Sequence, residues 1–338
     1  MIESTVLQIF KRRLPSARRR AVAAATIAAL ILTAAGASAQ QATPSTTPPA
    51  ELGARIEKLV KEHKGKATVA LKNLKTGETF SINPDEPMPT ASLIKFPVMV
   101  EAYRQAAEGK IDLNAPVTLR KKDMVPGSGV LTYHFSDGAT FPLVDAVHLM
   151  ITYSDNTATN IVLDAVGIGS TAATMEKLGY PNTKIHSKVF RRDTSVFPDR
   201  SKVFGLGSTT AGEMVKLFEA LQAKKLVDEK SSEAMWKHLL TCDDKAKFPR
   251  FLPAGTKVAF KTGSVDEART CAGVIETKGG PVALCVMTNA NEDQSWGDEN
   301  AGNVLCAKTA REVYDYFTAK APPSPTAAAS SGEAAATK

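Results

Sequence analysis

The chain has 338 residues, of which 43% are hydrophobic and 23% charged, and its formal net charge is +7. This composition is typical of a soluble globular protein and excludes collagen-like, disordered and multi-span membrane proteins. Six basic side chains lie in residues 1–39 against one acid, whereas residues 40–338 hold 36 basic and 34 acidic side chains. The nearly neutral larger part therefore gives no indication of a nucleic-acid partner.

Residues 1–39 predict an export signal. Their basic residues precede an apolar run over 21–35, and Ala37 and Ala39 follow it in the small-x-small pattern of a cleavage site. The run has about 15 residues, whereas roughly 20 are needed to span a bilayer. We therefore expect a signal peptide, cleavage after residue 39 and no stable membrane anchor afterwards, with an uncleaved anchor as the alternative. The three arginines at 18–20 leave Sec and twin-arginine export both open.

Low-complexity segments flank the folded part of the chain. A Pro- and Thr-rich linker occupies 40–50 and an Ala-, Ser- and Pro-rich tail occupies 320–338, and neither composition can bury a core. We therefore predict one folded domain over 51–319.

The hydrophobic pattern of this domain changes from helix to strand and back along the chain. Helical spacing occurs over 51–63, 96–107, 143–153, 156–166, 210–221 and 301–317, and strand patterns occur over 67–74, 79–82, 257–262, 272–276 and 282–287. Residues 181–208 show no periodicity and predict a long loop, a feature that is usually functional or disordered. The order of the elements predicts an α+β fold whose antiparallel sheet is assembled from both ends of the chain.

The cysteines and histidines indicate no metal site. Cys242, Cys271, Cys285 and Cys306 all lie in the last third of the chain without zinc-finger spacing, and the five histidines are scattered. In an oxidising compartment the cysteines can form one or two disulfides, but free buried cysteines fit the sequence equally well. We expect neither a metal nor any other cofactor.

Two short polar motifs could bring a hydroxyl close to an amine. Pro97 fits only in a first helical turn, so its helix starts near Ser92 and places Lys95 on the same face. A buried lysine beside another cation can be neutral enough to take the proton of a serine nucleophile. Ser154 and Asn156 lie in the break between two apolar helices, where they can face a cleft. Taken alone, the motif at Ser92 is more typical of a helix N-cap, and the motif at Ser154 is more typical of an inter-helix turn.

A third motif lies at the end of a predicted strand. Lys261 and Thr262 end this strand and precede Gly263 and Ser264. A lysine here can hold a substrate carboxylate, and a glycine lets a substrate backbone approach the edge of the strand. The same tripeptide occurs at 75–77, where it predicts a hairpin turn, so the tripeptide alone is a weak signal.

The three motifs occur in a fixed order, with S-x-x-K at Ser92, S-D-N 62 residues later and K-T-G another 107 residues on. This is the motif set of penicillin-recognising serine enzymes. The longer segments TASLIKFPVMVEAYRQ, GSGVLTYHFSDGATF and LPAGTKVAFKTGS add to it. Over 51–319 the chain therefore resembles a class A β-lactamase-type serine hydrolase. The resemblance implies a β-lactamase/transpeptidase-like α+β fold, with an antiparallel sheet flanked by helices and an all-helical subdomain.

The resemblance also implies a role for each motif residue. Ser92 would be the acylated nucleophile, Lys95 its proton acceptor and Ser154 a proton relay to the leaving nitrogen. The backbone N–H groups of Ser92 and Ser264 would form the oxyanion hole. Asn156 would hold the substrate amide, and Lys261 and Thr262 would orient its carboxylate. The implied substrate contacts are thus Asn156, Lys261, Thr262, Gly263, Ser264 and, by a weaker match, Arg269.

One residue of the family is missing from this sequence. The family's β-lactamases carry a glutamate in the long loop after S-D-N, where it activates the water that hydrolyses the acyl-enzyme. Residues 181–208 contain no glutamate, and the expected position falls near 188–190. Asp193 and Asp199 are the acids of the loop, and either would have to activate water from another direction. We therefore expect fast acylation and slow deacylation.

Three interpretations follow. The leading one is an exported bacterial serine hydrolase, periplasmic or secreted, that is acylated by β-lactams and hydrolyses them. A D-alanyl-D-alanine peptidase or other cell-wall peptide hydrolase would use the same acylation residues without a dedicated glutamate. The third is a penicillin-binding protein that acylates once without turnover. In each case we expect a monomer whose substrate is a small β-lactam or a D-Ala-D-Ala peptide, with no nucleic-acid partner.

Overall fold

The structure is a computed structural model that describes residues 50–321. The predicted export signal over 1–39, nearly all of the linker over 40–50 and nearly all of the tail over 320–338 lie outside the described residues. Within the described part, no helix is both long enough and apolar enough to cross a membrane.

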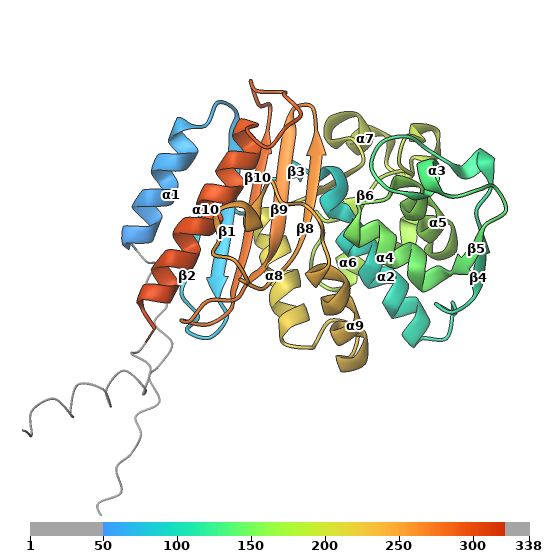
Figure 1. Cartoon of the computed structure of the whole chain (residues 1–338), viewed down its shortest axis with the longest axis horizontal. Helices are drawn as coiled ribbons and strands as arrows, with labels where there is room; N and C mark the ends of the chain where they lie inside the picture. The colour runs from blue at the N-terminus through green and yellow to red at the C-terminus, as the bar shows by residue number, and fades with distance from the viewer. Residues whose placement is uncertain (1–49, 322–338) are drawn as a thin grey trace, which may run out of the picture. The chain divides into compact units, whose positions relative to one another are not determined.

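A five-stranded antiparallel sheet in the order β2-β1-β10-β9-β8 forms the centre of the fold (Figure 1). Its strands are β1 (Lys66–Asn73), β2 (Thr79–Ile82), β8 (Val258–Val265), β9 (Ala268–Ile275) and β10 (Val282–Asn289). β1 pairs with β10 along its whole length, so the two ends of the domain meet in one sheet, as the sequence predicts. The α+β expectation is confirmed. β8 is an edge strand, which leaves one side of its backbone without a strand partner.

Helices cover both faces of this sheet. α1 (Ala50–Glu62) and α10 (Ala301–Ala319) pack on one face, and α8 (Ala211–Gln222) packs on the other. All eight residues of β9 are buried, because a strand covered on both faces has no solvent side. Alternate residues of β9 therefore enter two different cores. Cys271 joins the core beneath α1 and α10, whereas Ala272 joins the core that continues into the helical part.

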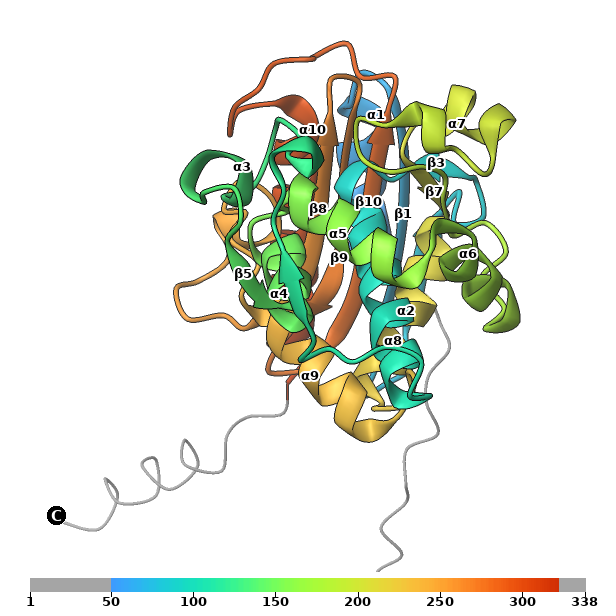
Figure 2. The same cartoon turned by 90° about the vertical axis from the view of Figure 1, so that its right-hand side faces the viewer.

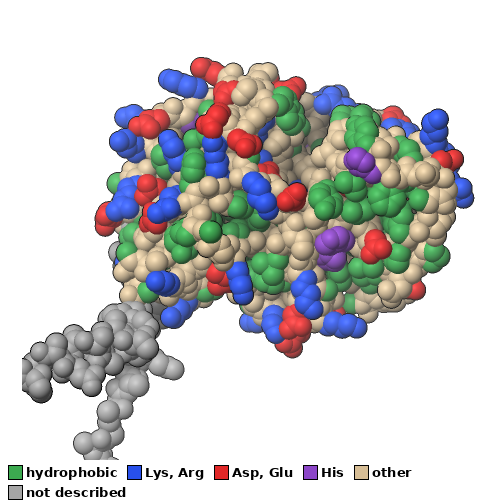
Figure 3. Space-filling view, viewed as in Figure 1, with side chains coloured by type: hydrophobic (Ala, Val, Ile, Leu, Met, Phe, Trp, Pro, Cys, Tyr) green, Lys and Arg blue, Asp and Glu red, His purple; other side chains and the backbone are tan. Residues whose placement is uncertain are grey.

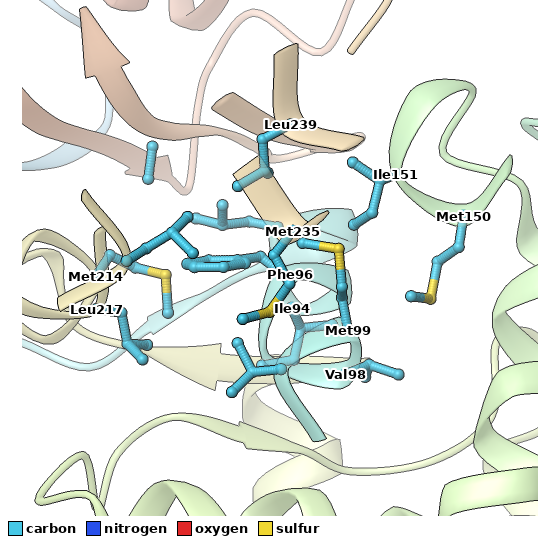
Figure 4. Packing of buried hydrophobic residues seen from close by; sticks show 14 of the residues in the cluster. Ile94, Phe96, Val98, Met99, Met150, Ile151, Met214, Leu217, Met235 and Leu239 are labelled. Atoms are coloured by element: carbon cyan, nitrogen blue, oxygen red, sulfur yellow. The ribbon is translucent and has the colours of Figure 1, made fainter. Parts of the chain in front are cut away.

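The helical part lies beside the β8 edge and in front of the sheet in the view of Figure 2. Its helices are α2 (Lys95–Ala107), α3 (Leu131–His134), α4 (Leu143–Thr152), α5 (Asn156–Val166), α6 (Ile168–Lys177), α7 (Pro198–Phe204) and α9 (Glu229–Leu240). α2 packs against α4, α5, α6 and α9, so nearly every residue of α2 is buried. Phe96 at its start lies among Met214, Met235 and Leu217 (Figure 4), and its ring centroid is 4.4 Å from that of Phe218. This packing fixes the first turn of α2 against the rest of the domain.

The long loop predicted over 181–208 contains regular structure. It holds β6 (Lys184–Ile185), α7 and β7 (Gly207–Thr209), and both strands pair in a small sheet with β3 (Met88–Pro89). Strands of two or three residues are too short for an alternating pattern, which explains why the sequence did not indicate them. Helices α6 and α9 also escaped prediction. α9 is rich in charged residues, and its start is marked by Asp228, which caps the Ser231 N–H.

The remaining elements are short. They are the strands β4 (Pro116–Thr118) and β5 (Thr140–Pro142) and the 3₁₀ turns at Ala91–Ile94, Lys121–Asp123, Arg192–Thr194 and Phe248–Phe251. All four cysteines are buried and free, so the disulfide alternative is not realised in the structure. Acidic and basic side chains are interspersed on the face seen in Figure 3, without a large patch of one sign.

Candidate active site

A cavity of about 960 Å³ lies between the edge of β8 and the segment 181–208. Six of the nine predicted site residues line it, namely Ser92, Ser154, Asn156, Thr262, Gly263 and Ser264. Lys95 and Lys261 are fully buried, and the Nζ of each lies 3.2 Å from Ser154 Oγ in the cavity wall. The fold therefore brings together, at one cavity, three motifs that are far apart in the sequence.

Ser92 lies in the 3₁₀ turn Ala91–Ile94, directly before the first turn of α2. Its neighbour Ala91 has a φ of +45°, a conformation that a residue with a side chain seldom adopts. Such strain persists only where the surroundings impose it, and it often marks a functional turn. The turn presents the partly exposed Ser92 to the cavity while Leu93 and Ile94 are buried in the core.

Gly263 holds β8 against this turn. A Cβ at Gly263 would lie 2.3 Å from the Thr90 carbonyl oxygen and 2.8 Å from the Leu93 nitrogen. From the sequence, a glycine here is expected to allow the close approach of a substrate backbone. In the structure, the backbone that approaches Gly263 is the chain's own turn around Ser92, and this contact accounts for the lack of a side chain.

Lys95 has the surroundings of a neutral amine. Its Nζ is 2.6 Å from the Ser154 carbonyl oxygen and 2.8 Å from Asn156 Oδ1, two atoms that can only accept. A neutral amine meets both with its two N–H bonds and keeps one lone pair. Burial and then the nearby charge of Lys261 lower the pKa of Lys95 well below its ordinary value. Lys95 is thus suited to accept a proton.

Ser154 lies between the two buried lysines. Its Oγ is 3.2 Å from both Lys95 Nζ and Lys261 Nζ. Its φ is +53°, and the next residue, Asp155, caps α5 by accepting from the Ala158 N–H. Asp155 also accepts from the N–H groups of Val130 and Leu131, so the inter-helix break is fixed from both sides. The hydroxyl is held where it can pass a proton between its neighbours.

The edge of β8 offers free backbone groups to the cavity. The Glu276 N–H donates to the Lys257 carbonyl, so the alternation of an antiparallel ladder turns the N–H and carbonyl groups of Thr262 and Ser264 away from β9. One of these groups, the Thr262 carbonyl, accepts from Lys261 Nζ at 2.8 Å. The Ser264 N–H therefore points outward, as an oxyanion donor at this position must.

Arg269 does not reach this cavity. Its guanidinium donates to the carbonyls of Val265, Ala268 and Ser295, and it lies 5.0 Å beneath the Trp296 ring. The side chain lies on the α10 face of the sheet, because a Cβ at Gly302 would touch it. Its contacts tie the β8–β9 turn to the loop that carries Trp296. The expected contact with a substrate carboxylate thus has no support in its position.

Lys247 is a cation at this site that the sequence did not indicate. It is buried, pairs with Asp244 at 2.7 Å and donates to Ser264 Oγ at 3.1 Å. Burial acts to raise the pKa of Asp244, but Lys247 and hydrogen bonds from Lys247 and Thr262 outweigh it and lower the pKa. Lys247 lies in an aperiodic run between a helix and a strand, so no local pattern marks it.

Ser128 is another residue of the site that the sequence did not indicate. It lines the cavity and donates to the Ser154 carbonyl at 2.7 Å. Its two neighbouring glycines are a sequence signal for a tight turn but not for a site.

The opposite wall carries no acid from the segment 181–208. Asp193 pairs with Arg191 and Asp199 with Lys202, both aspartates are exposed, and neither lines the cavity. The acids among the lining residues are Asp244, Asp266 and Glu267, which lie on the β8 side. At the expected place of the missing glutamate, Val189 and Phe190 face the cavity.

The described residues contain no group of three or more histidine, cysteine or acidic side chains that could hold a metal. A hydrogen bond of 3.1 Å joins His148 Nδ1 to His238 Nδ1, and another of 2.8 Å joins the Tyr103 hydroxyl to His238 Nε2. This chain of hydrogen bonds joins α2, α4 and α9, and its members do not line the cavity.

Comparisons with known proteins agree with this geometry. Residues 51–317 match the profile of the Beta-lactamase enzyme family. The extended-spectrum beta-lactamase PER-1 of Pseudomonas aeruginosa is 25% identical over 280 residues, which cover 78% of this chain and 87% of the relative. Beta-lactamase VEB-1 of the same species is 23% identical over 216 residues, which cover 63% of this chain and 71% of the relative.

Solved structures share the fold. A beta-lactamase from Sphaerobacter thermophilus is 27% identical, has a TM-score of 0.70, and is matched over 81% of this chain and 99% of its own. The protein PBP-A gives the same TM-score at 24% identity, over 81% of this chain and 98% of its own. The expected family and fold are confirmed, since the profile spans nearly all of the described residues. The chain belongs to the Beta-lactamase enzyme family and is a serine hydrolase of the β-lactamase type.

Proposed function

We propose that this protein opens β-lactam rings by forming an ester on Ser92, and that it releases the product slowly. The observation that carries the proposal is the buried Lys95, held by Ser154 and Asn156 in the wall of the cavity that contains Ser92. An uncharged amine at this place can activate a hydroxyl that is otherwise a poor nucleophile at neutral pH. The extended-spectrum beta-lactamase among the relatives supports the choice of substrate.

In the acylation step, Lys95 Nζ takes the proton of Ser92 as Oγ attacks the lactam carbonyl carbon. No hydrogen bond joins these two side chains in the described structure, and catalytic hydrogen bonds often form only with substrate present. The oxyanion receives hydrogen bonds from the N–H groups of Ser92 and Ser264. Ser154 then delivers its proton to the lactam nitrogen and receives the proton held by Lys95, the C–N bond breaks, and the ring opens as an ester of Ser92.

The substrate carboxylate would bind at the end of β8. Lys261, Thr262 and Ser264 carry the polar groups there, and Lys247 adds a positive charge beneath Ser264. A carboxylate at this place would accept hydrogen bonds from hydroxyl groups and gain from the buried Lys261 and from Lys247, whose charge is shared with Asp244. Lys247 therefore takes the role that the sequence analysis gave to Arg269.

The deacylation step is the slow one in this proposal. Water must attack the ester carbonyl, and a base has to take its proton. No acid of the segment 181–208 lines the cavity, so the wall that carries the deacylating glutamate in the family's β-lactamases has no such group here. The absence of this acid favours a second candidate function, a D-alanyl-D-alanine peptidase. Such an enzyme would use the same acylation residues without a dedicated glutamate.

A paired assay tests both functions. Turnover of a chromogenic cephalosporin is compared with turnover of a D-Ala-D-Ala peptide, while intact mass spectrometry follows the acylated protein. We expect a mass increase by one β-lactam that persists for minutes, together with slow cephalosporin turnover. Fast turnover without a trapped acyl-enzyme would contradict slow deacylation. Peptide turnover above cephalosporin turnover would favour the peptidase.

We also propose that the protein is exported. The basic start, the apolar run over 21–35 and the cleavage pattern at Ala39 support this. The test is expression of the full chain in a bacterium, followed by fractionation and sequencing of the N-terminus. A mature chain that begins at Gln40 in the periplasm or medium is expected, and an uncleaved chain in the membrane fraction would contradict the proposal.

A further inference from the structure

Phe190 is an aromatic side chain whose conformation and surroundings are both unfavourable. Its φ is +58°, in the left-handed region that favours glycine, and 63% of the residue is exposed. It also lines the cavity. A strained backbone and an uncovered ring both cost free energy, and such features are retained where the surroundings impose them and the site uses them.

Helix α5 imposes this conformation. The side chain of Asn160 accepts from the Val189 N–H at 2.8 Å and donates to the Val189 carbonyl at 3.1 Å. Asn160 is buried, so both bonds are protected from water. Lys188 pairs with Asp164 of the same helix, and its N–H donates to Thr194 Oγ1. Val189, the residue before Phe190, is therefore held through both its N–H group and its carbonyl group.

The same helix carries the residue assigned to the substrate amide. Asn156 precedes Asn160 by four positions, so the two side chains project from one face of α5. A Cβ at Gly127 would lie 2.6 Å from Asn156 Nδ2 and 3.3 Å from the Phe190 ring. The ring and the Asn156 amide thus both lie close to the position of one missing side chain, at the same cavity.

We infer that Phe190 determines specificity by contacting the side chain that the substrate carries beyond its amide, and that it selects an apolar, aromatic group. The inference rests on the proposed function, in which Asn156 binds that amide. Val203 and Phe204 line the same cavity from the same segment, and Val203 is also largely exposed. An aromatic acyl group would cover these surfaces, and aromatic pairs gain more than their area alone provides.

The test compares two β-lactams that differ only in this group. Penicillin G carries a phenylacetyl amide, and 6-aminopenicillanic acid carries a free amine on the same ring system. Second-order rate constants for acylation of the full-length protein are measured by intact mass spectrometry. We expect Phe190→Ala to lower the constant for penicillin G about 10-fold and that for 6-aminopenicillanic acid less than twofold. The ratio of the two effects isolates the contact.

Two further variants keep the test decisive. Phe190→Gly removes the ring at a position where glycine adopts the observed φ without strain, so this variant should unfold no more easily than the wild type. It is expected to show the same loss for penicillin G. Phe135→Ala removes an aromatic that is 43% exposed and does not line the cavity, and it should leave both constants unchanged.

Equal losses for both substrates, or no loss for penicillin G in either Phe190 variant, would overturn the inference while the proposed function stands. A wild-type protein that neither substrate acylates would overturn the proposed function, and the inference with it.

Discussion

The two sides of the cavity differ in the groups that they present. On one side, Lys95 and Lys261 are fully buried, and their hydrogen-bond partners lie between 2.6 Å and 3.2 Å away. On the side of the segment 181–208, the lining residue Phe190 is strained and exposed, and the acids of the segment pair with arginine and lysine away from the cavity. This difference supports the proposal that the site forms an acyl-enzyme readily and hydrolyses it slowly.

The largest effect is expected from removing the nucleophile. Ser92→Ala should abolish covalent labelling by a fluorescent penicillin, because the proposed acyl-enzyme is an ester of the Ser92 hydroxyl and the variant has no such hydroxyl. Labelling is read on a denaturing gel. The variant should melt at the wild-type temperature, since Ser92 is partly exposed and makes no contact on which the core depends. Covalent labelling of the Ser92→Ala variant would show that the motif assignment is wrong.

Lys95→Arg should lower the rate of acylation by a factor of about 10³, because a guanidinium cannot give up its proton to act as a base. The wild type supplies the matching pH test. Because burial and the charge of Lys261 lower the pKa of Lys95 well below its ordinary value, the neutral base forms at a lower pH than that of a free lysine, so acylation should level off below about pH 9 and fall on acidification. An acylation rate that keeps rising through pH 9 to 10 would mean that Lys95 is charged at neutral pH.

A carboxylate added to the opposite wall should shorten the life of the acyl-enzyme. Phe190→Glu places an acid beside Asn156 and Gly127, and we expect deacylation to accelerate about 10- to 100-fold, in the range of general base catalysis. Decay of the acylated mass is followed after excess penicillin is removed. Phe190→Gln has nearly the same shape without a base and is the matched control. Equal acceleration by both variants would indicate a loss of shielding by the ring instead.

Gly263→Ala should lower the free energy of unfolding, because β8 packs closely against the turn around Ser92 at this glycine. The added methyl group would overlap the Thr90 carbonyl oxygen, and overpacking of this kind costs about 1–3 kcal/mol of unfolding free energy. Urea unfolding measures the loss, and acylation should slow because the nucleophile turn is displaced. Gly169→Ala in α6 has open space around its Cβ and should be neutral or slightly stabilising. Wild-type stability in Gly263→Ala would show that the turn can yield.

The smallest effect concerns acid stability away from both walls. Burial, and then the neighbouring His148, lowers the pKa of His238 to about 4 in the folded protein. An unfolded histidine binds its proton near pH 6.5, so the unfolded state gains protons first on acidification. The contribution of His238 to stability is therefore present above about pH 6.5 and declines as the pH falls toward 4.

Urea midpoints at pH 7 and pH 4.5 measure this effect, and His238→Gln should lose less stability over this interval than the wild type. The comparison also separates protonation of Lys95 from unfolding as the reason for lost acylation in acid. Equal losses in both proteins would assign the acid sensitivity to other groups.

Much of the fold was predictable because periodic patterns are local. The bounds of α5 and β2 agree with the sequence prediction, and those of β1, α4 and α10 lie within about two residues of it. Patterns of this length report which face of an element is buried. The two-residue strand Lys184–Ile185 and the charged helix Glu229–Leu240 carry no such pattern, and only their tertiary partners stabilise them.

The candidate site divides in the same way. The sequence alone determined the order of S-x-x-K, S-D-N and K-T-G, and with it the family, because each motif is a local run of residues. Only the tertiary structure decided which charges meet at the cavity. Arg269 and Thr270 are adjacent, but a strand turns successive side chains to opposite faces, so Thr270 bonds the Thr90 carbonyl behind the nucleophile while Arg269 faces α10.

Lys247 shows the converse case, a charge that arrives at the site from an unpatterned segment because its carboxylate partner Asp244 holds it there. Local spacing determines which chemistry a chain can present, whereas strand register and burial determine which side chains take part in it.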